Sequence, residues 1–264
     1  MSEQDWLWLG TAGFGLGFLV LLAFGWNRRT RDEESHWLIH LFVVLTAFTS
    51  YLVMASGGGR LLLADGRVLF VARYIDWSIT TPLLLLGLSL TALHTPFRRW
   101  ALVLGLMATD AYMIVTGLFA DAAPAGSALK WTWYLVSSGA FVFIYLCLWG
   151  AMRREAETSG KLAAAVYRRN LTFLSLVWLA YPLVFLFGTE GLRSLGEGTE
   201  TALYTLLDLT AKVAFGLFSL ANTRRRVSEE LRAGLVPEHD LRPSRQAFHE
   251  QWAPGTGRSD EDRR

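Results

Sequence analysis

The sequence predicts an all-α membrane protein, a bundle of seven transmembrane helices with its N-terminus outside the cell and its C-terminus in the cytoplasm. The first observation is a set of seven apolar stretches of about 20 residues each, which as helices rise by roughly 30 Å and match the hydrocarbon core of a bilayer. The second is positive charge concentrated in alternate loops. A large soluble helical protein is the alternative, but seven such stretches leave no amphipathic helices to cover them.

Polar loops and interfacial tryptophans bound these stretches. The predicted spans are residues 6–26, 37–57, 68–92, 100–120, 130–150, 169–188 and 200–222. Tryptophans favour the membrane–water interface, and they stand near span ends at Trp6, Trp26, Trp37, Trp100, Trp131 and Trp149. Glu3 and Asp5 precede the first span and arginines follow it. This charge pattern does not indicate a signal peptide, so we expect the first span to stay as an anchor.

Loop charges predict the orientation. With the N-terminus outside, the cytoplasmic loops hold thirteen lysines and arginines and the outer loops hold four. The cytoplasmic set is Arg28, Arg29, Arg31, Arg98, Arg99, Arg153, Arg154, Lys161, Arg168, Arg169, Arg224, Arg225 and Arg226, and the outer set is Arg60, Arg67, Lys130 and Arg193. Because basic residues accumulate on the cytoplasmic side of membrane proteins, this bias supports an outside N-terminus.

We expect two regions in the chain. Residues 1–223 form the membrane domain, and residues 224–264 form a charged cytoplasmic tail that is too poor in apolar residues to fold alone. Within the tail, residues 227–235 could form a short helix. The net charge of +2 does not predict nucleic-acid binding. No phosphate loop, metal-ligand spacing or nucleophile elbow predicts an enzyme, and the one cysteine, Cys147, excludes an intrachain disulfide.

Ionisable residues inside the spans are the main functional signal. A charge at mid-membrane costs several kcal/mol unless it is paired, so each one is a functional hypothesis. Taken in chain order, the candidates at depth are His40 in the second span, Arg73 and Asp76 in the third, Asp110 in the fourth, and Asp208 and Lys212 in the seventh, with Glu190 and Glu200 at the outer edge.

Counting along the helices brings four of these residues together. Arg73 and Asp76 lie one turn apart near the outer end of the third span, and Lys212 lies roughly 18 Å into the seventh. Asp208 is one turn further out than Lys212 on the same helix face. The two cations and two carboxylates make a neutral cluster. A static salt-bridge network is the alternative, but buried ion pairs stabilise poorly relative to apolar packing, whereas a buried lysine can bind an aldehyde.

Three motifs closely resemble those of the microbial (type I) rhodopsins, and of the bacteriorhodopsin-like proton pumps in particular. They are RYIDWSITTPLLLLGL in the third span, WLAYPLVFLFG in the sixth and LLDLTAKVAFGL in the seventh. The resemblance covers roughly residues 6–222. It implies a light-driven outward proton pump that is not an enzyme, with all-trans retinal bound covalently to Lys212 as a protonated Schiff base.

The resemblance also implies roles for the carboxylates near Lys212. Asp76 would be the main counterion and the acceptor of the proton, and Thr80 would hydrogen-bond its carboxylate. Asp208 would be the second counterion, hydrogen-bonded to Tyr51 and Tyr181. A protonated nitrogen in a medium of low dielectric constant needs such a nearby anion.

The remaining roles concern proton release and the retinal slot. Arg73 would balance the carboxylates, Glu190 and Glu200 would take part in release, and Asp110 would be a structural residue near the ring end of retinal. A long apolar ligand favours flat aromatic walls. The resemblance places in the slot Trp77, Thr81, Leu84, Met113, Gly117, Trp133, Tyr134, Trp178, Tyr181, Pro182, Phe185 and the nearby Tyr51.

Gly87 departs from the family pattern. It lies eleven residues after Asp76, where related pumps carry a carboxylate that returns a proton from the cytoplasmic side. We expect His40 to replace that donor, because it lies at nearly the same depth, shares a helix face with Tyr51 and titrates near neutral pH. His36 could help to feed protons to it. A histidine that reaches the membrane interface without a transport role is the alternative.

The predicted function is light-driven outward proton pumping in a bacterial inner membrane. Protons and the lipid bilayer are the expected partners, and the resemblance implies a homo-oligomer, a trimer or a pentamer. A photosensory rhodopsin that signals through a partner protein is one alternative, supported by Gly87. An anion or sodium pump is another, but Asp76 disfavours chloride transport and the Asp76–Thr80 pair lacks the pattern of sodium pumps.

Overall fold

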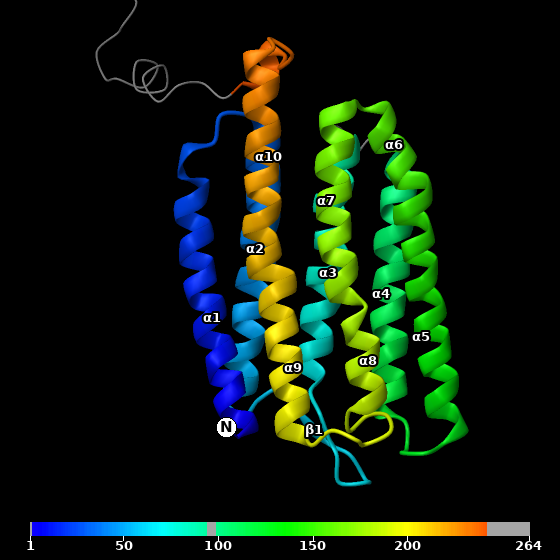
Figure 1. Cartoon of the computed structure of the whole chain (residues 1–264). Coiled ribbons are helices and arrows are strands. Elements are labelled where there is room, and N and C mark those ends of the chain that lie inside the picture. The colour runs from blue at the N-terminus through cyan, green and yellow to red at the C-terminus, as the bar shows by residue number, and fades with distance from the viewer. Residues whose placement is uncertain (1, 94–98, 242–264) are drawn as a thin grey trace, which may run out of the picture.

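The computed structural model describes residues 2–93 and 99–241. Within these residues, seven helical stretches are long and apolar enough to cross a membrane. They run along one direction as an elongated bundle (Figure 1). The predicted all-α fold with seven transmembrane helices is thus confirmed.

Four spans are each built on one continuous helix. They are α1 (Glu3–Phe24) with the short turn η1 (Gly25–Asn27), α2 (Arg31–Ala55), α3 (Val71–Leu93) and α4 (Trp100–Ala122). Three spans contain a break or a widened turn. They are α5 (Ala128–Cys147), η3 (Leu148–Met152) and α6 (Arg153–Thr158); α7 (Lys161–Trp178) and α8 (Ala180–Phe187); and α9 (Glu197–Leu209), η4 (Thr210–Ala214) and α10 (Phe215–Arg232).

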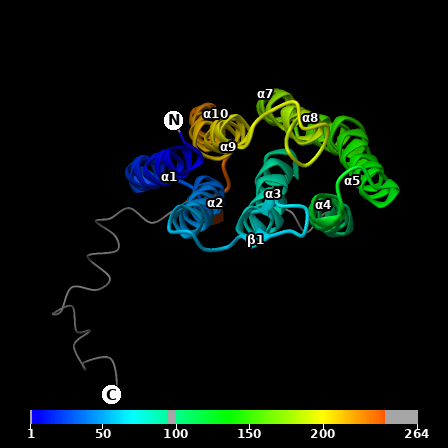
Figure 2. The same ribbon diagram turned by 90° about the horizontal axis from the view of Figure 1, so that it is seen from below.

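Helix α3 lies inside the bundle. Neighbouring spans pack in chain order from α1 to α5, and α9 packs back against α1. Helix α3 also contacts α7, and the view along the bundle shows it between α2 and α4, opposite α9 and α7 (Figure 2). Its inward residues, such as Leu84 and Leu88, form the main apolar core with Trp178 and Phe215. The third and seventh spans are thereby held close enough for their ionisable residues to meet.

A small β-hairpin closes the end of the bundle that carries the N-terminus, which we call the hairpin end. Strand β1 (Leu61–Leu62) pairs antiparallel with β2 (Val68–Leu69), and the hairpin projects beyond the helices (Figure 1). The opposite end, where α10 finishes, is called the tail end below. A 3-10 turn, η5 (Glu238–Asp240), follows α10 there.

Arg67 fastens the hairpin to the start of the α4–α5 loop. Its guanidinium donates to the Asp121 carboxylate at 3.0 Å and to the main-chain oxygens of Asp121 and Ala123 at 2.9 and 3.0 Å. Its Nε donates to Asp65 at 2.8 Å, and this hydrogen bond lowers the pKa of the Asp65 carboxyl group. Sequence analysis treated Arg67 only as an outer-loop charge and missed these contacts, which we call the Arg67 clasp.

The boundary of the tail differs from the prediction. Helix α10 continues without a break to Arg232, so the expected tail begins as a continuation of the seventh span, and the short helix considered for residues 227–235 is part of α10 as far as Arg232. The reason is that Arg226 is buried, contacts Asp32 on α2 and lies 3.6 Å from Glu230 one turn later. These pairs anchor the end of the helix. Residues 242–264 of the predicted tail lie outside the described residues.

Candidate functional site

Lys212 lies at the centre of the site, in the widened turn η4. Such π-helical turns insert one extra residue into a helix and are frequent at functional sites. The lysine is almost completely buried. Its Nζ donates to Asp208 Oδ1 at 3.1 Å and contacts Asp76 Oδ2 across the bundle. The structure therefore brings together the lysine and the two aspartates that sequence counting placed at similar depth.

Asp208 is surrounded by donors. Tyr51 donates to Oδ2 at 2.8 Å and Tyr181 donates to Oδ1 at 2.9 Å, as predicted. The indole Nε1 of Trp77 adds a third bond to Oδ1 at 3.0 Å, which sequence analysis did not foresee. Three donors besides Lys212 therefore hold this buried carboxyl group in place.

Asp76 has fewer partners than Asp208. Its Oδ1 has no hydrogen-bond partner within the described residues. The Thr80 hydroxyl donates to the main-chain oxygen of Asp76 at 2.8 Å and lies beside the Asp76 carboxylate, where the prediction placed its bond. Helical threonines commonly bond the carbonyl group four residues earlier in this way. The Asp76 carboxylate therefore keeps one oxygen free to accept a hydrogen bond or a proton.

Arg73 lies on the hairpin side of this cluster. Its side chain is buried, and the guanidinium stands over the rings of Tyr204 at 4.5 Å and Phe70 at 5.0 Å. Cation–π contacts of this kind stabilise a desolvated guanidinium by about 2 kcal/mol. The arginine therefore sits between the Asp76–Lys212–Asp208 cluster and the two glutamates at the hairpin end.

Glu190 and Glu200 form a close carboxyl pair at the hairpin end. Both side chains are buried, and both approach Gly188, where a Cβ atom would lie 2.6 Å from one and 2.9 Å from the other. The main-chain N–H of Thr189 donates to Glu200 at 2.6 Å. Burial, reinforced by a hydrogen bond with Glu200, raises the pKa of Glu190 well above its usual value. The predicted pairing of the two residues is thus present, and Gly188 makes room for it.

An aromatic cavity borders the lysine cluster. It is lined by Tyr74, Trp77, Thr81, Asp110, Met113, Ile114, Gly117, Tyr134, Ser137, Ser138, Phe141, Trp178, Tyr181, Pro182, Phe185 and Tyr204. Trp77 and Tyr181 both line it and bond Asp208, so the cavity and the charged cluster share two walls. Thr81 donates to Asp110 at 2.5 Å inside the cavity, which agrees with a structural aspartate.

Three predicted slot residues do not line this cavity, and one of them, Tyr51, instead donates to Asp208. Trp133 packs on Phe119 with ring centroids 5.2 Å apart, and Leu84 belongs to the apolar core of α3. Six lining residues were missed, namely Tyr74, Ile114, Ser137, Ser138, Phe141 and Tyr204. The signal for three of them was helical spacing, since Ser137, Ser138 and Phe141 follow Tyr134 by three, four and seven residues and so share its helix face.

His40 lies at the predicted depth, next to Gly87. It is 1% exposed, and a Cβ atom at Gly87 would stand 4.0 Å from its Nε2. On the other side it faces Gly216 and the Phe215 ring. Neither ring nitrogen has a hydrogen-bond partner in the part of the chain that the structure describes. Buried polar atoms normally have partners, so an imidazole of this kind suggests a functional role.

The fold and the site together define an integral, multi-pass membrane protein of the microbial rhodopsin class. Seven apolar helices surround one buried lysine that is flanked by two aspartates and an aromatic cavity. Residues 1–225 match the family model described as bacteriorhodopsin-like protein. The chain belongs to the bacteriorhodopsin-like family.

Individual relatives are similar over most of the chain. Cruxrhodopsin-1 of Haloarcula argentinensis is 33% identical over 83% of this chain and 89% of its own length. Bacteriorhodopsin of Halobacterium salinarum is 35% identical over 83% of this chain and 84% of its own. The crystal structure of thermophilic rhodopsin from Rubrobacter xylanophilus superimposes with a TM-score of 0.81, at 38% identity, over 86% of this chain and 98% of that one. Members of this family are light-driven pumps or photoreceptors, so the protein is not an enzyme.

The residues present fit the retinal that this family binds through a lysine. The cavity is predominantly aromatic and apolar, as a polyene requires. Lys212 Nζ lies between two carboxylates, which suits a nitrogen that keeps its positive charge after it has bound an aldehyde. The free oxygen of Asp76 adds an acceptor at the same place.

Proposed function

We propose that the protein is a light-driven outward proton pump of a bacterial inner membrane. The observation that carries the proposal is the buried Lys212 Nζ, in contact with Asp76 and Asp208 beside an aromatic cavity. Membership of a family that includes bacteriorhodopsin proton pumps supports it. We place the hairpin end outside and the tail end in the cytoplasm, because basic residues gather in the loops of the tail end.

Lys212 would hold all-trans retinal, and Trp77, Trp178 and Tyr181 would enclose it. When bound, retinal supplies the absorption of light and an isomerisation that moves the charged nitrogen relative to its counterions. The protein residues then decide where the proton goes. Lipid surrounds the bundle in this proposal, and a homo-oligomer, trimer or pentamer, stays a prediction.

Asp76 is the proposed acceptor of the proton from Lys212 Nζ. Asp208 accepts three hydrogen bonds besides that of Lys212, and a proton on it would compete with these donors. Asp76 contacts Lys212 but has one oxygen without a partner in the described residues. A proton that leaves Nζ therefore binds Asp76 in preference to Asp208.

Release would run toward the hairpin end through Arg73, Glu190 and Glu200. Once Asp76 is neutral, Arg73 loses an anionic neighbour on the cluster side and is attracted toward the glutamate pair. A closer guanidinium stabilises the ionised pair. The proton that Glu190 holds at rest, as its raised pKa indicates, would then be released to the outside.

His40 would return a proton to Lys212 Nζ from the cytoplasmic side. The missing side chain at Gly87 lets the imidazole lie beside α3 on the tail side of Lys212. An imidazole can both bind and release a proton, so His40 can give one to Nζ and take up another from the cytoplasm. This step replaces the carboxylate donor that the family pattern would place at Gly87.

A photosensory rhodopsin that signals through a partner is the second candidate, and Gly87 is the observation that favours it. A receptor does not need a residue that quickly returns a proton to Lys212 Nζ, so it would tolerate a glycine at this position. The carboxyl pair Glu190–Glu200 and the buried His40 favour the pump, since signalling requires neither group.

The test is light-induced acidification by cells that express the protein and are supplied with retinal. A pump acidifies the medium under light and a protonophore abolishes the signal. His40→Ala should lower the steady acidification rate about tenfold by slowing the return of a proton to Nζ, and added azide should restore part of it, whereas the exposed Ser35→Ala should not change it. If the medium does not acidify under light, the pump is excluded and the photosensory function remains. An unchanged acidification rate in His40→Ala would contradict the role of His40 as proton donor.

A further inference from the structure

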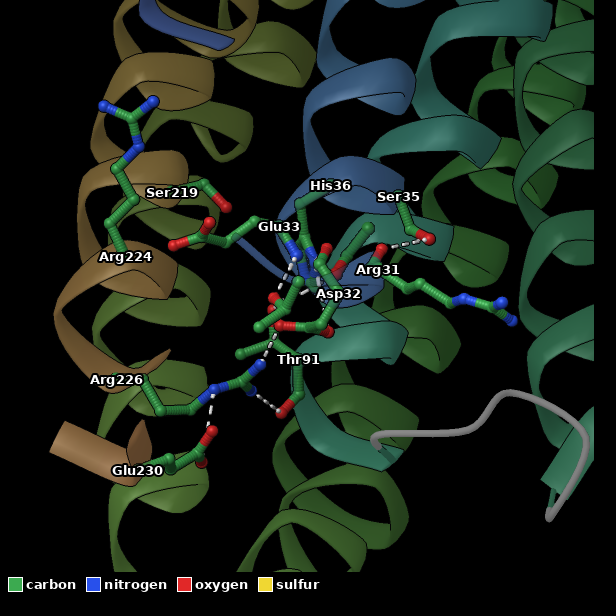
Figure 3. A network of polar contacts seen from close by, with 12 residues as sticks. Arg31, Asp32, Glu33, Ser35, His36, Thr91, Ser219, Arg224, Arg226 and Glu230 are labelled. Carbon is green, nitrogen blue, oxygen red and sulfur yellow. Dashed lines mark hydrogen bonds and ion pairs between the residues drawn. The ribbon is translucent and has the colours of Figure 1, made fainter. Parts of the chain in front are cut away.

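The tail end contains a second buried histidine that the proposed cycle does not yet use. His36 lies one turn before His40 on α2 and is 0% exposed. Residues four apart on a helix share one face, so His36 stands between His40 and the tail-end surface. Figure 3 shows His36 enclosed by Asp32 of the same helix, Thr91 of α3 and Arg226 of α10.

The hydrogen bonds of His36 restrict where its hydrogens are. Nδ1 lies 2.9 Å from the main-chain oxygen of Asp32, which can only accept, so Nδ1 carries a hydrogen. Nε2 lies 3.1 Å from the hydroxyl oxygen of Thr91. That hydroxyl has one hydrogen, and the carbonyl oxygen of Gly87 also lies 3.1 Å from it. When Thr91 donates to Gly87, His36 must donate from both nitrogens, and the ring is an imidazolium.

Charged groups lie close to the His36 ring. Asp32 Oδ1 lies 3.5 Å from Nδ1, and Arg226 contacts the same carboxylate and lies 3.6 Å from Glu230. Of the other charged groups on α2, Glu33 is already paired with Arg29 at 2.7 Å. The Asp32 carboxylate therefore lies between the His36 ring and the buried Arg226 guanidinium.

We propose that His36 is a proton reservoir that reloads His40, and that the Asp32–Arg226 pair holds it in place; this inference rests on the proposed function. The Thr91 hydroxyl acts as the switch. When it turns from the Gly87 carbonyl to Nε2, the N–H bond at His36 Nε2 is broken and one forms on His40. His36 is left neutral with its hydrogen on Nδ1. A proton from the tail-end solvent, which reaches the partly exposed Asp32, then restores the charged ring.

The first experiment measures the protonation of His36 directly, without retinal. In ¹⁵N NMR spectra of the retinal-free protein at neutral pH, with the His36→Gln variant used for assignment, both ring nitrogens should carry a hydrogen. Asp32→Asn should convert His36 to the neutral ring, and Glu34→Gln, the same charge change on the same helix, should not. A His36 that is neutral in the wild type, or that stays charged in Asp32→Asn, would overturn the proposal.

The second experiment separates the reservoir from the donor. In retinal-loaded protein, flash spectroscopy follows the proton on Lys212 Nζ and a pH-sensitive dye follows uptake from solution. His36→Gln should leave the return of the proton to Nζ unchanged and slow uptake about tenfold, and Thr91→Val should slow uptake in the same way. Thr49→Val, which removes an equivalent hydroxyl on an exposed face, should have no effect.

The two proposals fail differently. If His40→Gln leaves the return of the proton to Nζ unchanged, His40 is not the donor, while the NMR result still reports on His36. If His36→Gln slows the return as much as His40→Gln does, or leaves uptake at the wild-type rate, His36 is not a separate reservoir.

Discussion

At the scale of single residues, the site depends on two aspartates that differ in their surroundings although they share one lysine. Asp208 is held by Tyr51, Tyr181 and Trp77. Asp76 keeps an oxygen without a partner in the described residues. The same ammonium group thus has one fixed anion and one anion that can be neutralised. This difference between the two aspartates directs proton transfer toward Asp76.

Glu190 provides a prediction on pH dependence. Its pKa is raised above the ordinary 4.5, first by burial and then by the hydrogen bond with Glu200. The folded protein therefore binds this proton more tightly than the unfolded chain does. Stability from this source is fully present below about pH 4.5 and is lost as the pH rises through the raised pKa, by up to about 1.4 kcal/mol per pH unit.

Thermal unfolding in detergent between pH 4 and pH 9 checks this. Glu190→Gln should remove that part of the slope of melting temperature against pH, because glutamine does not titrate. The exposed Glu197→Gln should keep the slope. An identical slope of melting temperature against pH in Glu190→Gln and the wild type would contradict the raised pKa of Glu190.

Sequence alone predicted those residues whose positions follow from helix geometry. Lys212 and Asp208 are four residues apart on one helix, and depth counting then brought Asp76 to them. It could not predict the third donor to Asp208, since the rotation of the Trp77 indole depends on α9 and α8 packing beside it. The contact of Trp133 with Phe119 is likewise absent from helical spacing, because it depends on how α4 and α5 pack.

At the scale of elements, the widened turn η4 concerns the direction of the Lys212 side chain, and the Arg67 clasp concerns the position of the hairpin. The turn lies at Lys212 itself, where an extra residue in the helical turn alters the direction of the side chain. The clasp joins the hairpin turn to the end of α4 and the start of the next loop, and so it holds the hairpin against the helices. Neither element had a clear sequence signal, because both depend on contacts far apart in the chain.

The clasp gives a stability prediction. Arg67→Gln removes the guanidinium hydrogen bonds to Asp121 and Ala123 and leaves Lys130, among the described residues, as the remaining buried cation near Asp121. Breaking a buried ion pair costs about 3–5 kcal/mol. We expect the melting temperature of the protein in detergent to fall by several degrees. The exposed Arg60→Gln, in the same connection, is the control and should melt like the wild type. Equal melting of all three proteins would mean that the clasp does not stabilise the fold.

At the scale of the whole molecule, ionisable groups form three levels along the bundle. The glutamate pair and Arg73 lie at the hairpin end, Lys212 with its aspartates lies in the middle, and His40 with the His36 network lies toward the tail end. Apolar packing separates the levels. A chain arranged in this way can pass a proton from level to level and prevent free leakage, which is what a pump requires.

The central claim is that light moves the proton from Lys212 Nζ to Asp76. Time-resolved infrared spectroscopy of the retinal-loaded protein measures it most directly, through the C=O stretch that appears when a carboxylate becomes a carboxylic acid. We expect this band to rise at the rate at which Nζ loses its proton. It should be absent in Asp76→Asn and persist in the control Asp65→Asn. A band that rises unchanged in Asp76→Asn would contradict the account, because another group would then be the acceptor.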